Sequence, residues 1–188
     1  MVARAEAAAA SGQRILDAAV EVFWELPTNQ ISLDEVARRA GVTVQTVIRR
    51  FGGRDGLLAA AVERESEKVR RQRDEAEPDD PPGAVRVLIN HYEVMGDRVL
   101  KMLAEEERVP ALKAIVDRGR TLHRAWCARV FAPAIDPLRG LERERRLAQL
   151  VALCDVYTWK LLRRDAGLSR RQTELAVLEL LNPCLEGS

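Results

Sequence analysis

The chain has 188 residues, of which 47% are hydrophobic and 31% are charged, and its formal net charge is +1. This hydrophobic fraction is large enough to build a buried core, so the composition excludes an intrinsically disordered chain. A net charge close to zero gives no support for a nucleic-acid partner, and evidence for one must come from a local cluster of positive charge.

The first residues and the cysteines indicate the compartment. Residues 1–12 are rich in alanine but lack the apolar core of a signal peptide, and we predict a flexible tail there. No apolar run reaches the ~18 residues that a membrane-spanning helix needs. The cysteines Cys127, Cys154 and Cys184 are odd in number and widely spaced, which fits a reducing compartment. We therefore expect a cytoplasmic protein without a membrane partner.

Residues 32–58 predict two short helices joined by a tight turn, followed by the start of a third helix. Ser32 and Glu35 have the Ser-x-x-Glu spacing of a capping box, which satisfies free N–H groups at a helix start. Gly41 follows where a helix can end in a left-handed residue, and Thr43 can cap the next helix. Helix-turn-helix proteins use this arrangement to place their second helix in the DNA major groove.

The second short helix separates its side chains by direction. By helical periodicity, Val47 and Phe51 point the same way and are expected in the core, while Gln45 lies roughly opposite. Arg49 shares the side of Gln45. Because arginine can fork onto guanine and glutamine onto adenine, we predict that Gln45 and Arg49 read bases.

A cluster of positive charge surrounds this helix. Five arginines lie at positions 38, 39, 49, 50 and 54, and the acidic residues fall just before or just after them. This clustering favours an anionic partner, whereas the alternative for each single arginine is a solvated surface charge. Neighbouring hydroxyl and guanidinium groups suit phosphate contacts. The predicted DNA-binding residues are Ser32, Thr43, Val44, Gln45, Thr46, Ile48, Arg49, Arg50 and Arg54.

Two runs of sequence, RILDAAVEVFWE and ISLDEVARRAGVTVQTVIRRFGGRDGLLAAAVE, resemble the tetracycline-repressor (TetR) family of transcriptional regulators. In that family they form the opening helix, the helix-turn-helix and the linker helix toward a ligand domain. The resemblance covers roughly the first third of the chain. It implies an all-helical homodimer, usually a repressor, that binds a double-stranded DNA operator and responds to a small-molecule effector.

The chain also departs from the pattern of the family. Pro27 and Thr28 stand where a glycine beside an aromatic residue is common, and proline cannot adopt a positive φ. Ile48 replaces the usual tyrosine, Arg50 a histidine-like position, and Val44 a frequent lysine. Val44 or Ile48 can instead contact a thymine methyl group. The operator of a relative therefore does not transfer to this chain.

The remaining sequence predicts helices at 54–75, 84–106, 110–131, 141–165 and 169–181, without a competing strand pattern. The mixed-charge run 63–77 predicts a solvated face, and the proline-rich segment that follows predicts a break. We expect an all-α fold of about nine helices. Its predicted parts are a flexible tail at 1–12, a three-helix helix-turn-helix domain at 13–58, and a ligand-binding and dimerisation bundle at 59–188.

The last two predicted helices, 141–165 and 169–181, carry apolar residues on more than one side. One side can pack inward while the other packs against a second copy of the chain. The resemblance implies the same, because the corresponding helices of the family build a four-helix interface. The alternative is that all of this apolar surface is internal core.

The middle of the C-terminal region carries aromatic and sulfur-containing side chains that suit a pocket for a mainly hydrophobic ligand. For any one of these residues, ordinary core packing is the stronger alternative. The predicted pocket residues are Tyr92, Met95, Met102, Leu122, His123, Trp126, Cys127, Cys154, Tyr157 and Trp159.

Other functions have weaker support. The chain has only two histidines and carries no phosphate-binding loop or nucleophile motif, so we predict no enzymatic activity and no cofactor. His123 and Cys127 are spaced for one helix face, but two ligands are a weak case for a metal site, and none is predicted. A helical adaptor, or a ligand-binding protein that acts without sequence-specific DNA binding, remains the alternative.

Overall fold

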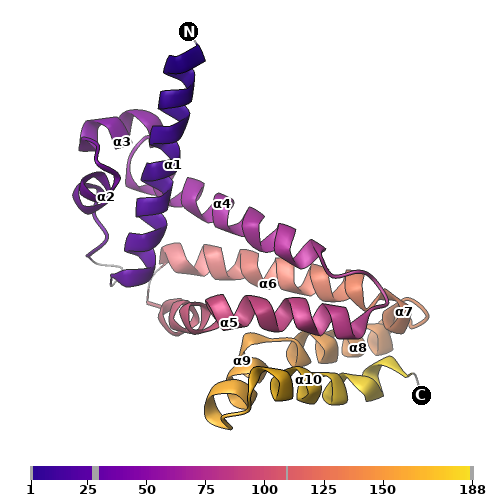
Figure 1. Cartoon of the computed structure of the whole chain (residues 1–188). Helices are drawn as coiled ribbons and strands as arrows, with labels where there is room; N and C mark the ends of the chain where they lie inside the picture. Colours follow the sequence, from indigo (N-terminus) through magenta and orange to yellow (C-terminus); the bar gives the residue numbers. More distant parts are fainter. Residues whose placement is uncertain (1, 27–29, 109, 187–188) are drawn as a thin grey trace. The chain divides into compact units, whose positions relative to one another are not determined.

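The computed structural model describes residues 2–26, 30–108 and 110–186, which form helices and contain no strand, so the predicted all-α fold is confirmed for them (Figure 1). The helices are α1 (Val2–Glu25), α2 (Leu33–Ala40), α3 (Val44–Phe51), α4 (Arg54–Asp74), α5 (Pro81–Glu105), α6 (Pro110–Val130), α7 (Ala132–Ile135), α8 (Gly140–Leu153), α9 (Val156–Lys160), the π-helical segment Leu161–Asp165, and α10 (Arg170–Leu185). None of these helices is both long and apolar enough to cross a membrane. The chain divides inside α4 into two compact units, Met1–Glu67 and Lys68–Ser188.

The N-terminal unit is built around α1, which packs on α2, while α2 packs on α3. Its core contains the fully buried side chains of Ile15, Val22 and Val47. Helix α1 begins at Val2, so residues 2–12 are helical where the sequence predicts a flexible tail. Alanine has the highest helix propensity of all residues, which explains the extension. The departures at Pro27 and Thr28 lie outside the described residues.

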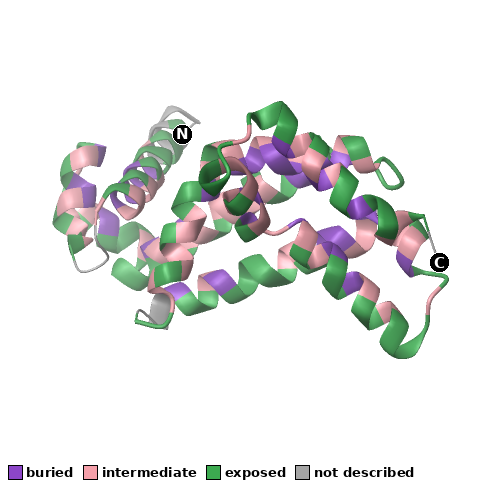
Figure 2. Cartoon of the chain, turned by 90° about the horizontal axis from the view of Figure 1, so that it is seen from below, coloured by how far each residue is buried: buried purple, intermediate pink, exposed green. Residues whose placement is uncertain are grey.

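In the C-terminal unit, α5 packs on α6, α9 and α10, and α8 packs on α6 and α10. Buried residues run along the inner sides of these helices and exposed residues along their outer sides (Figure 2). The largest fully buried side chains of this core include Trp159, Phe131 and Leu150. The apolar faces of these amphipathic helices therefore pack together into one hydrophobic core.

The prediction of one long helix at 141–165 is wrong, because the helix is interrupted between α8 and α9. The Asp155 side chain accepts a hydrogen bond from the Tyr157 backbone N–H at 2.9 Å and caps the start of α9. The Thr158 hydroxyl donates to the Ala152 carbonyl, which closes the turn. The Tyr92 hydroxyl donates to the Cys154 carbonyl, which the break leaves free. Side-chain partners thus replace the helical bonds that are lost.

Other helix ends differ less from expectation. Helix α5 begins at Pro81 because Asp80 caps it and proline is tolerated in a first helical turn. The segment expected as a loop after residue 131 contains the short helix α7. Helix α10 continues to Leu185, beyond its predicted end at residue 181, and it begins with a capping box formed by Ser169 and Gln172.

Close packing of α5 against Trp159 leads to a testable prediction. A Cβ added at Gly96 would overlap the Trp159 ring. We expect Gly96→Ala to destabilise the C-terminal unit by about 1–3 kcal/mol, the usual cost of overpacking a core. Urea unfolding followed by tryptophan fluorescence measures this change.

Gly119 of α6 is the matched control, since a Cβ added there meets no atom within 4 Å. Gly119→Ala should stabilise the protein by roughly 0.5–1 kcal/mol through helix propensity alone. Equal effects of the two substitutions would show that the contact with Trp159 is unimportant.

Candidate nucleic-acid interface

Helix α2 and the turn after it are fixed by local hydrogen bonds and by burial. The Ser32 hydroxyl accepts a hydrogen bond from the Glu35 backbone N–H at 3.2 Å and caps α2. Gly41 ends the helix in the left-handed region, with φ 64°. Val36 and Ala37 are buried against the core.

Helix α3 is held in one orientation by its cap and its buried side. The Thr43 side chain caps it by accepting a hydrogen bond from the Thr46 backbone N–H at 3.2 Å. Val47 has no exposed surface, which anchors α3 to the N-terminal core. Gln45 and Arg49 are exposed. This exposed side presents an amide and a guanidinium group to solvent on a rigid, capped helix.

Most of the other predicted DNA-binding residues also reach the surface. Ile48 is 38% exposed, which is unusual for a large apolar side chain and leaves it free for a contact such as a thymine methyl. Val44 is only half-buried and packs against the N-terminal core. The exposed members of the predicted set are Ser32, Thr43, Gln45, Ile48, Arg49, Arg50 and Arg54, and the half-buried members are Val44 and Thr46.

Two of the five clustered arginines are neutralised inside the N-terminal unit. Glu35 forms ion pairs with Arg38 at 2.7 Å and with Arg39 at 2.8 Å. Hydrogen bonds from these two guanidinium groups lower the pKa of Glu35 to about 2. Arg39 also pairs with Glu25 of α1. The positive charge available to a phosphate backbone is therefore smaller than the sequence implies.

The remaining three arginines differ in their surroundings. The Arg50 guanidinium lies against Gly12 of α1, where an added Cβ would overlap it. Arg54 donates a hydrogen bond to the Ile31 carbonyl at 3.4 Å. Arg49 makes no hydrogen bond or ion pair with the described part of the chain. Its guanidinium group is thus the most available one on α3.

The structure adds Arg14 to the basic residues of this unit. Its guanidinium lies at the end of α2, with Nε 3.5 Å from the Ala40 carbonyl. Sequence reasoning missed it, because nothing in the pattern of α1 shows which cation lies beside the turn.

The ion pairs of Glu35 predict a dependence of stability on pH. The folded-state pKa is lowered from 4.5, so the carboxylate stabilises the fold above about pH 4.5, and this contribution is lost as the pH falls toward about 2. We expect Glu35→Gln to lower the urea midpoint at neutral pH, and the difference from the wild type to shrink with acidification.

Asp34→Asn is the control, because Asp34 belongs to the same turn and forms no ion pair with the described residues. It should change the urea midpoint much less than Glu35→Gln. A Glu35→Gln effect of the same size at neutral pH and at about pH 3 would refute the assigned role of the ion pairs.

The predicted pocket residues of the C-terminal unit do not all share one place. Five of them lie in one buried cluster: Tyr92, Trp126, Cys127, Cys154 and Trp159. The rings of Tyr92 and Trp159 are 5.9 Å apart. Met95, Met102, Leu122 and His123 are half-buried. Tyr157 is 53% exposed and lies outside the buried cluster.

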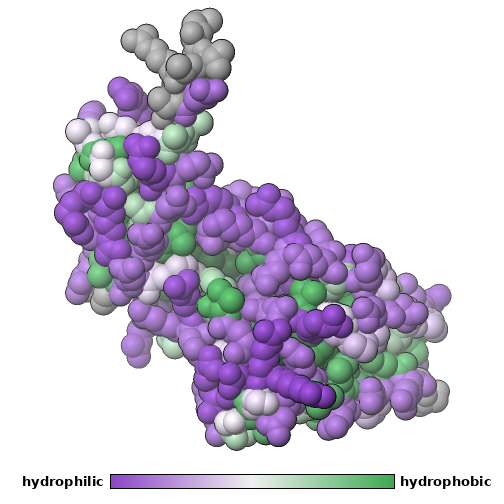
Figure 3. Space-filling view, viewed as in Figure 1, coloured by the Kyte–Doolittle hydropathy of each residue, from purple (hydrophilic) through white to green (hydrophobic). Residues whose placement is uncertain are grey.

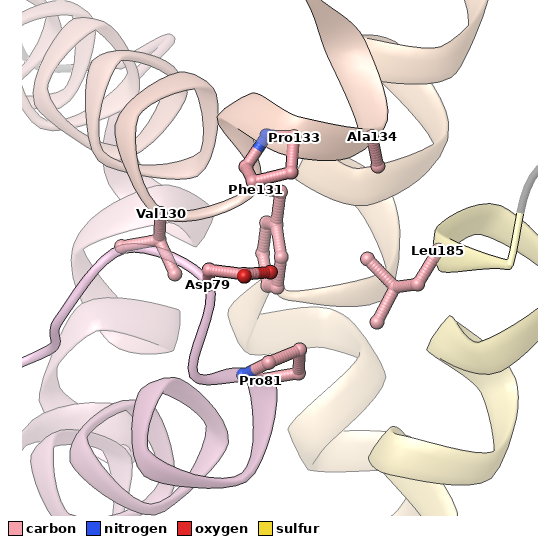
Figure 4. A pocket seen from close by; sticks show the side chains of 7 residues that line it. All are labelled: Asp79, Pro81, Val130, Phe131, Pro133, Ala134 and Leu185. Carbon is pink, nitrogen blue, oxygen red and sulfur yellow. The ribbon is translucent and has the colours of Figure 1, made fainter.

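A hollow of about 110 Å³ opens elsewhere in this unit, and none of the predicted pocket residues lines it. It is lined by Asp79, Pro81, Val130, Phe131, Pro133, Ala134 and Leu185, whose side chains surround it in Figure 4. Its volume is well below that of an ordinary ligand pocket, which is roughly 300–1,000 Å³.

Two further findings concern the polar groups of this unit. Within the described residues, no group of three or more His, Cys, Asp or Glu side chains is placed to hold a metal ion. The mixed-charge run 63–77 is not entirely solvated, because Arg73 is only 8% exposed. Sequence reasoning assigned Arg73 to a solvated face, and its neighbours in sequence give no sign of its burial.

Known proteins are similar to this chain in sequence or in fold. Residues 15–61 match the sequence model of the family described as "Bacterial regulatory proteins, tetR family". An uncharacterized HTH-type transcriptional regulator from Mycobacterium tuberculosis is 36% identical over 62 residues, which are 33% of this chain and 31% of the relative. The match thus spans about a third of the length of this curated relative.

Two solved structures are similar over nearly the whole chain. The crystal structure of a transcriptional regulator from Rhodococcus sp. RHA1 covers 93% of this chain and 96% of its own, with a TM-score of 0.68 and 22% identity. FadR from Bacillus subtilis, crystallised with stearoyl-CoA, covers 94% of this chain and 98% of its own, with a TM-score of 0.65 and 18% identity. At these identities, the similarity shows a shared fold.

Proposed function

We propose that this chain, whose residues 15–61 match the sequence model of the tetR family of bacterial regulatory proteins, is a transcriptional regulator that binds a palindromic operator as a homodimer. Repression is the default sign of regulation in the family, and a mainly hydrophobic small molecule releases the protein from DNA. The observation that carries the proposal is the exposed Gln45–Arg49 side of α3, which is opposite the buried Val47.

In this proposal, Gln45 and Arg49 contact base edges in the major groove, while Thr43, Thr46, Arg50 and Arg54 contact phosphates. The freedom of Arg49 from internal ion pairs supports its role as a base reader. Ser32 is retained as a candidate contact, although its hydroxyl already caps α2.

Dimerisation is proposed through the exposed apolar residues near the end of the chain. We name Tyr157, Leu161, Leu175 and Leu180 the C-terminal apolar surface; they are 53%, 60%, 50% and 45% exposed. Figure 3 shows hydrophobic residues reaching the surface of the C-terminal unit in patches among hydrophilic ones. Burial of such residues by a second copy removes them from water. Two linked recognition helices then bind half-sites spaced by about one helical turn.

Ligand response is proposed to act through α4, which begins in the N-terminal unit and ends in the C-terminal one. A ligand that binds one conformation of the bundle better shifts the population toward it and moves this helix. A coupling of roughly 1–3 kcal/mol would change operator affinity about 5- to 150-fold. The stearoyl-CoA bound to the similar FadR structure supports a ligand with a large apolar part.

The alternative is a helical adaptor or a ligand-binding protein that does not bind specific DNA. Selection of bound sequences from random duplex DNA separates the two. The proposal expects a palindromic consensus, with binding that weakens as salt rises. A single non-palindromic half-site would overturn the dimeric version, and failure to enrich any sequence would favour the adaptor. In this proposal the protein acts in the cytoplasm, without a cofactor and without catalysing a reaction.

A further inference from the structure

A buried positive charge lies in the C-terminal unit, at the end of α4. The side chain of Arg73 is 8% exposed, and its guanidinium carbon lies 4.7 Å from the centre of the Trp126 ring and 5.4 Å from that of Tyr92. The Arg73 carbonyl accepts hydrogen bonds from the Trp126 indole at 2.9 Å and from Arg129 at 3.1 Å. The backbone at Arg73 is therefore fixed, and its side chain is held between two aromatic rings.

Two of the three guanidinium nitrogens of Arg73 lack the hydrogen-bond partners that buried cations normally have. Its Nε and Nη1 atoms are buried and make no hydrogen bond. Arg73 also forms no ion pair with any described carboxylate. Leaving a buried charge unpaired costs several kcal/mol, so such groups are usually paired. Cation–π contacts with two rings offset only part of this cost.

No neighbouring ionisable group makes a hydrogen bond to the buried Nε and Nη1 atoms of Arg73. Burial, followed by the charge of Arg73, lowers the pKa of His91 to about 3, so His91 is neutral. Burial raises the pKa of the Tyr92 hydroxyl, which stays protonated although the charge of Arg73 and a hydrogen bond with its side chain act in the opposite direction. The pKa of Cys127 is lowered to about 6, first by its hydrogen bond with Cys154. No hydrogen bond joins the Cys127 sulfur to the free guanidinium atoms.

A second unsatisfied polar atom lies beside the same tryptophan. His123 stacks on Trp126 with the ring centres 6.2 Å apart, and its buried Nδ1 has no partner. Its Nε2 lies 3.1 Å from the Val151 carbonyl, which assigns the proton to Nε2 and leaves Nδ1 as an acceptor. Unsatisfied donors on Arg73 and an unsatisfied acceptor on His123 thus flank Trp126.

We propose that Arg73 binds the carboxylate of an apolar monocarboxylic acid that lodges against Tyr92 and Trp126 in the C-terminal unit. The inference rests on the proposed function, because it assigns a chemical class to the effector. The planar fork of arginine matches a carboxylate with two parallel hydrogen bonds. A single negative charge balances the single buried cation, whereas a phosphate monoester would bring an excess of about half to one charge.

Binding of the acid requires the packing around Arg73 to open, because the free guanidinium atoms are buried. The closed form therefore carries the cost of an unpaired charge, and the opened form with bound acid does not. The acid therefore binds the opened conformation better than the closed one. Any effector must have such a difference in affinity between two conformations. Since Arg73 belongs to the last turn of α4, the preference acts directly on the helix shared by both units.

The test uses the full chain without DNA, and its probes are benzoate, phenylacetate and octanoate with their neutral amides. Calorimetry and quenching of tryptophan fluorescence measure binding. We expect at least one acid to bind about 10- to 100-fold more tightly than its amide, the effect of one charge-assisted interaction. Arg73→Gln should remove this preference while leaving amide binding unchanged.

Arg164→Gln is the matched control. Its guanidinium also lies over an aromatic ring, 4.5 Å from the centre of Trp159, but it is paired with Asp97. This variant should keep the preference for the acid. Arg73→Met should raise the melting temperature of the unliganded protein, because an apolar side chain replaces an unpaired buried charge. An Arg73 that served only the structure would instead make Arg73→Met melt lower.

The proposal is overturned if no acid binds, if each acid and its amide bind equally, or if Arg73→Gln keeps the preference. The comparison of acid with amide on the wild type stands even if a variant fails to fold. Its failure differs from failure of the proposed function: a protein that selects an operator but binds no acid overturns only this inference, and one that binds an acid but no DNA overturns the proposed function.

Discussion

Replacement of Leu175 by glutamate is expected to convert the proposed homodimer into monomers and to lower operator affinity by about 10²- to 10⁴-fold. Leu175 lies on α10 and is 50% exposed in the single chain. In the proposed dimer, it is covered by the partner, where an unpaired carboxylate is costly. In a dimer, binding of the second half-site is an intramolecular step, because the two recognition helices are linked. A monomer loses this second contact and the affinity that it adds.

Analytical ultracentrifugation and operator titration at one fixed salt concentration measure the two effects. Leu141→Glu is the control, because Leu141 is 80% exposed at the start of α8 and does not belong to the C-terminal apolar surface. It should remain dimeric with unchanged operator affinity. If Leu175→Glu also remains dimeric, the interface lies elsewhere, and if the wild type is monomeric, the operator model of two half-sites is wrong.

The second large effect is expected at the exposed side of α3. Arg49→Ala should weaken binding to the selected operator by about 1–3 kcal/mol per half-site, or roughly 2–6 kcal/mol per dimer. Gln45→Ala should act at a different base of the half-site. Both variants should relax sequence preference at the base that each contacts, since a lost base contact costs affinity only for the correct sequence.

Titration with operators mutated one base pair at a time measures this preference. Arg38→Ala is the control, because Arg38 is an exposed arginine of the same unit whose charge is already paired with Glu35. It should weaken binding slightly and uniformly. If Arg49→Ala also weakens all sequences equally, Arg49 contacts phosphate and does not read a base.

Local signals in the sequence were enough to predict α2, α3 and the turn between them. Helix caps and left-handed glycines depend on neighbouring residues, so Ser32, Gly41 and Thr43 could be assigned from spacing alone. The direction of Val47 followed from helical periodicity, and its complete burial agrees with that assignment. The DNA contacts themselves stay predictions, because they depend on a partner.

Features that depend on tertiary contacts could not be predicted. The break at Asp155 involves Tyr92, which is far away in the sequence, and periodicity alone favoured one continuous helix. The pairing of Arg39 with Glu25 joins two helices and reduces a charge cluster that looked free in the sequence. Burial of Arg73 depends on rings from α5 and α6, so its flanking charges suggested solvent instead.

The continuity of α4 across the two units constrains how this chain can vary in length. One extra residue in a helix advances everything beyond it by about 1.5 Å and rotates it by about 100°. An insertion between Glu67 and Lys68 would therefore rotate the side chains at the end of α4, including that of Arg73, relative to the side chains before the insertion. An insertion in the non-helical connection between α4 and α5 would not change the direction of any α4 side chain. Natural length variants are therefore expected in that connection.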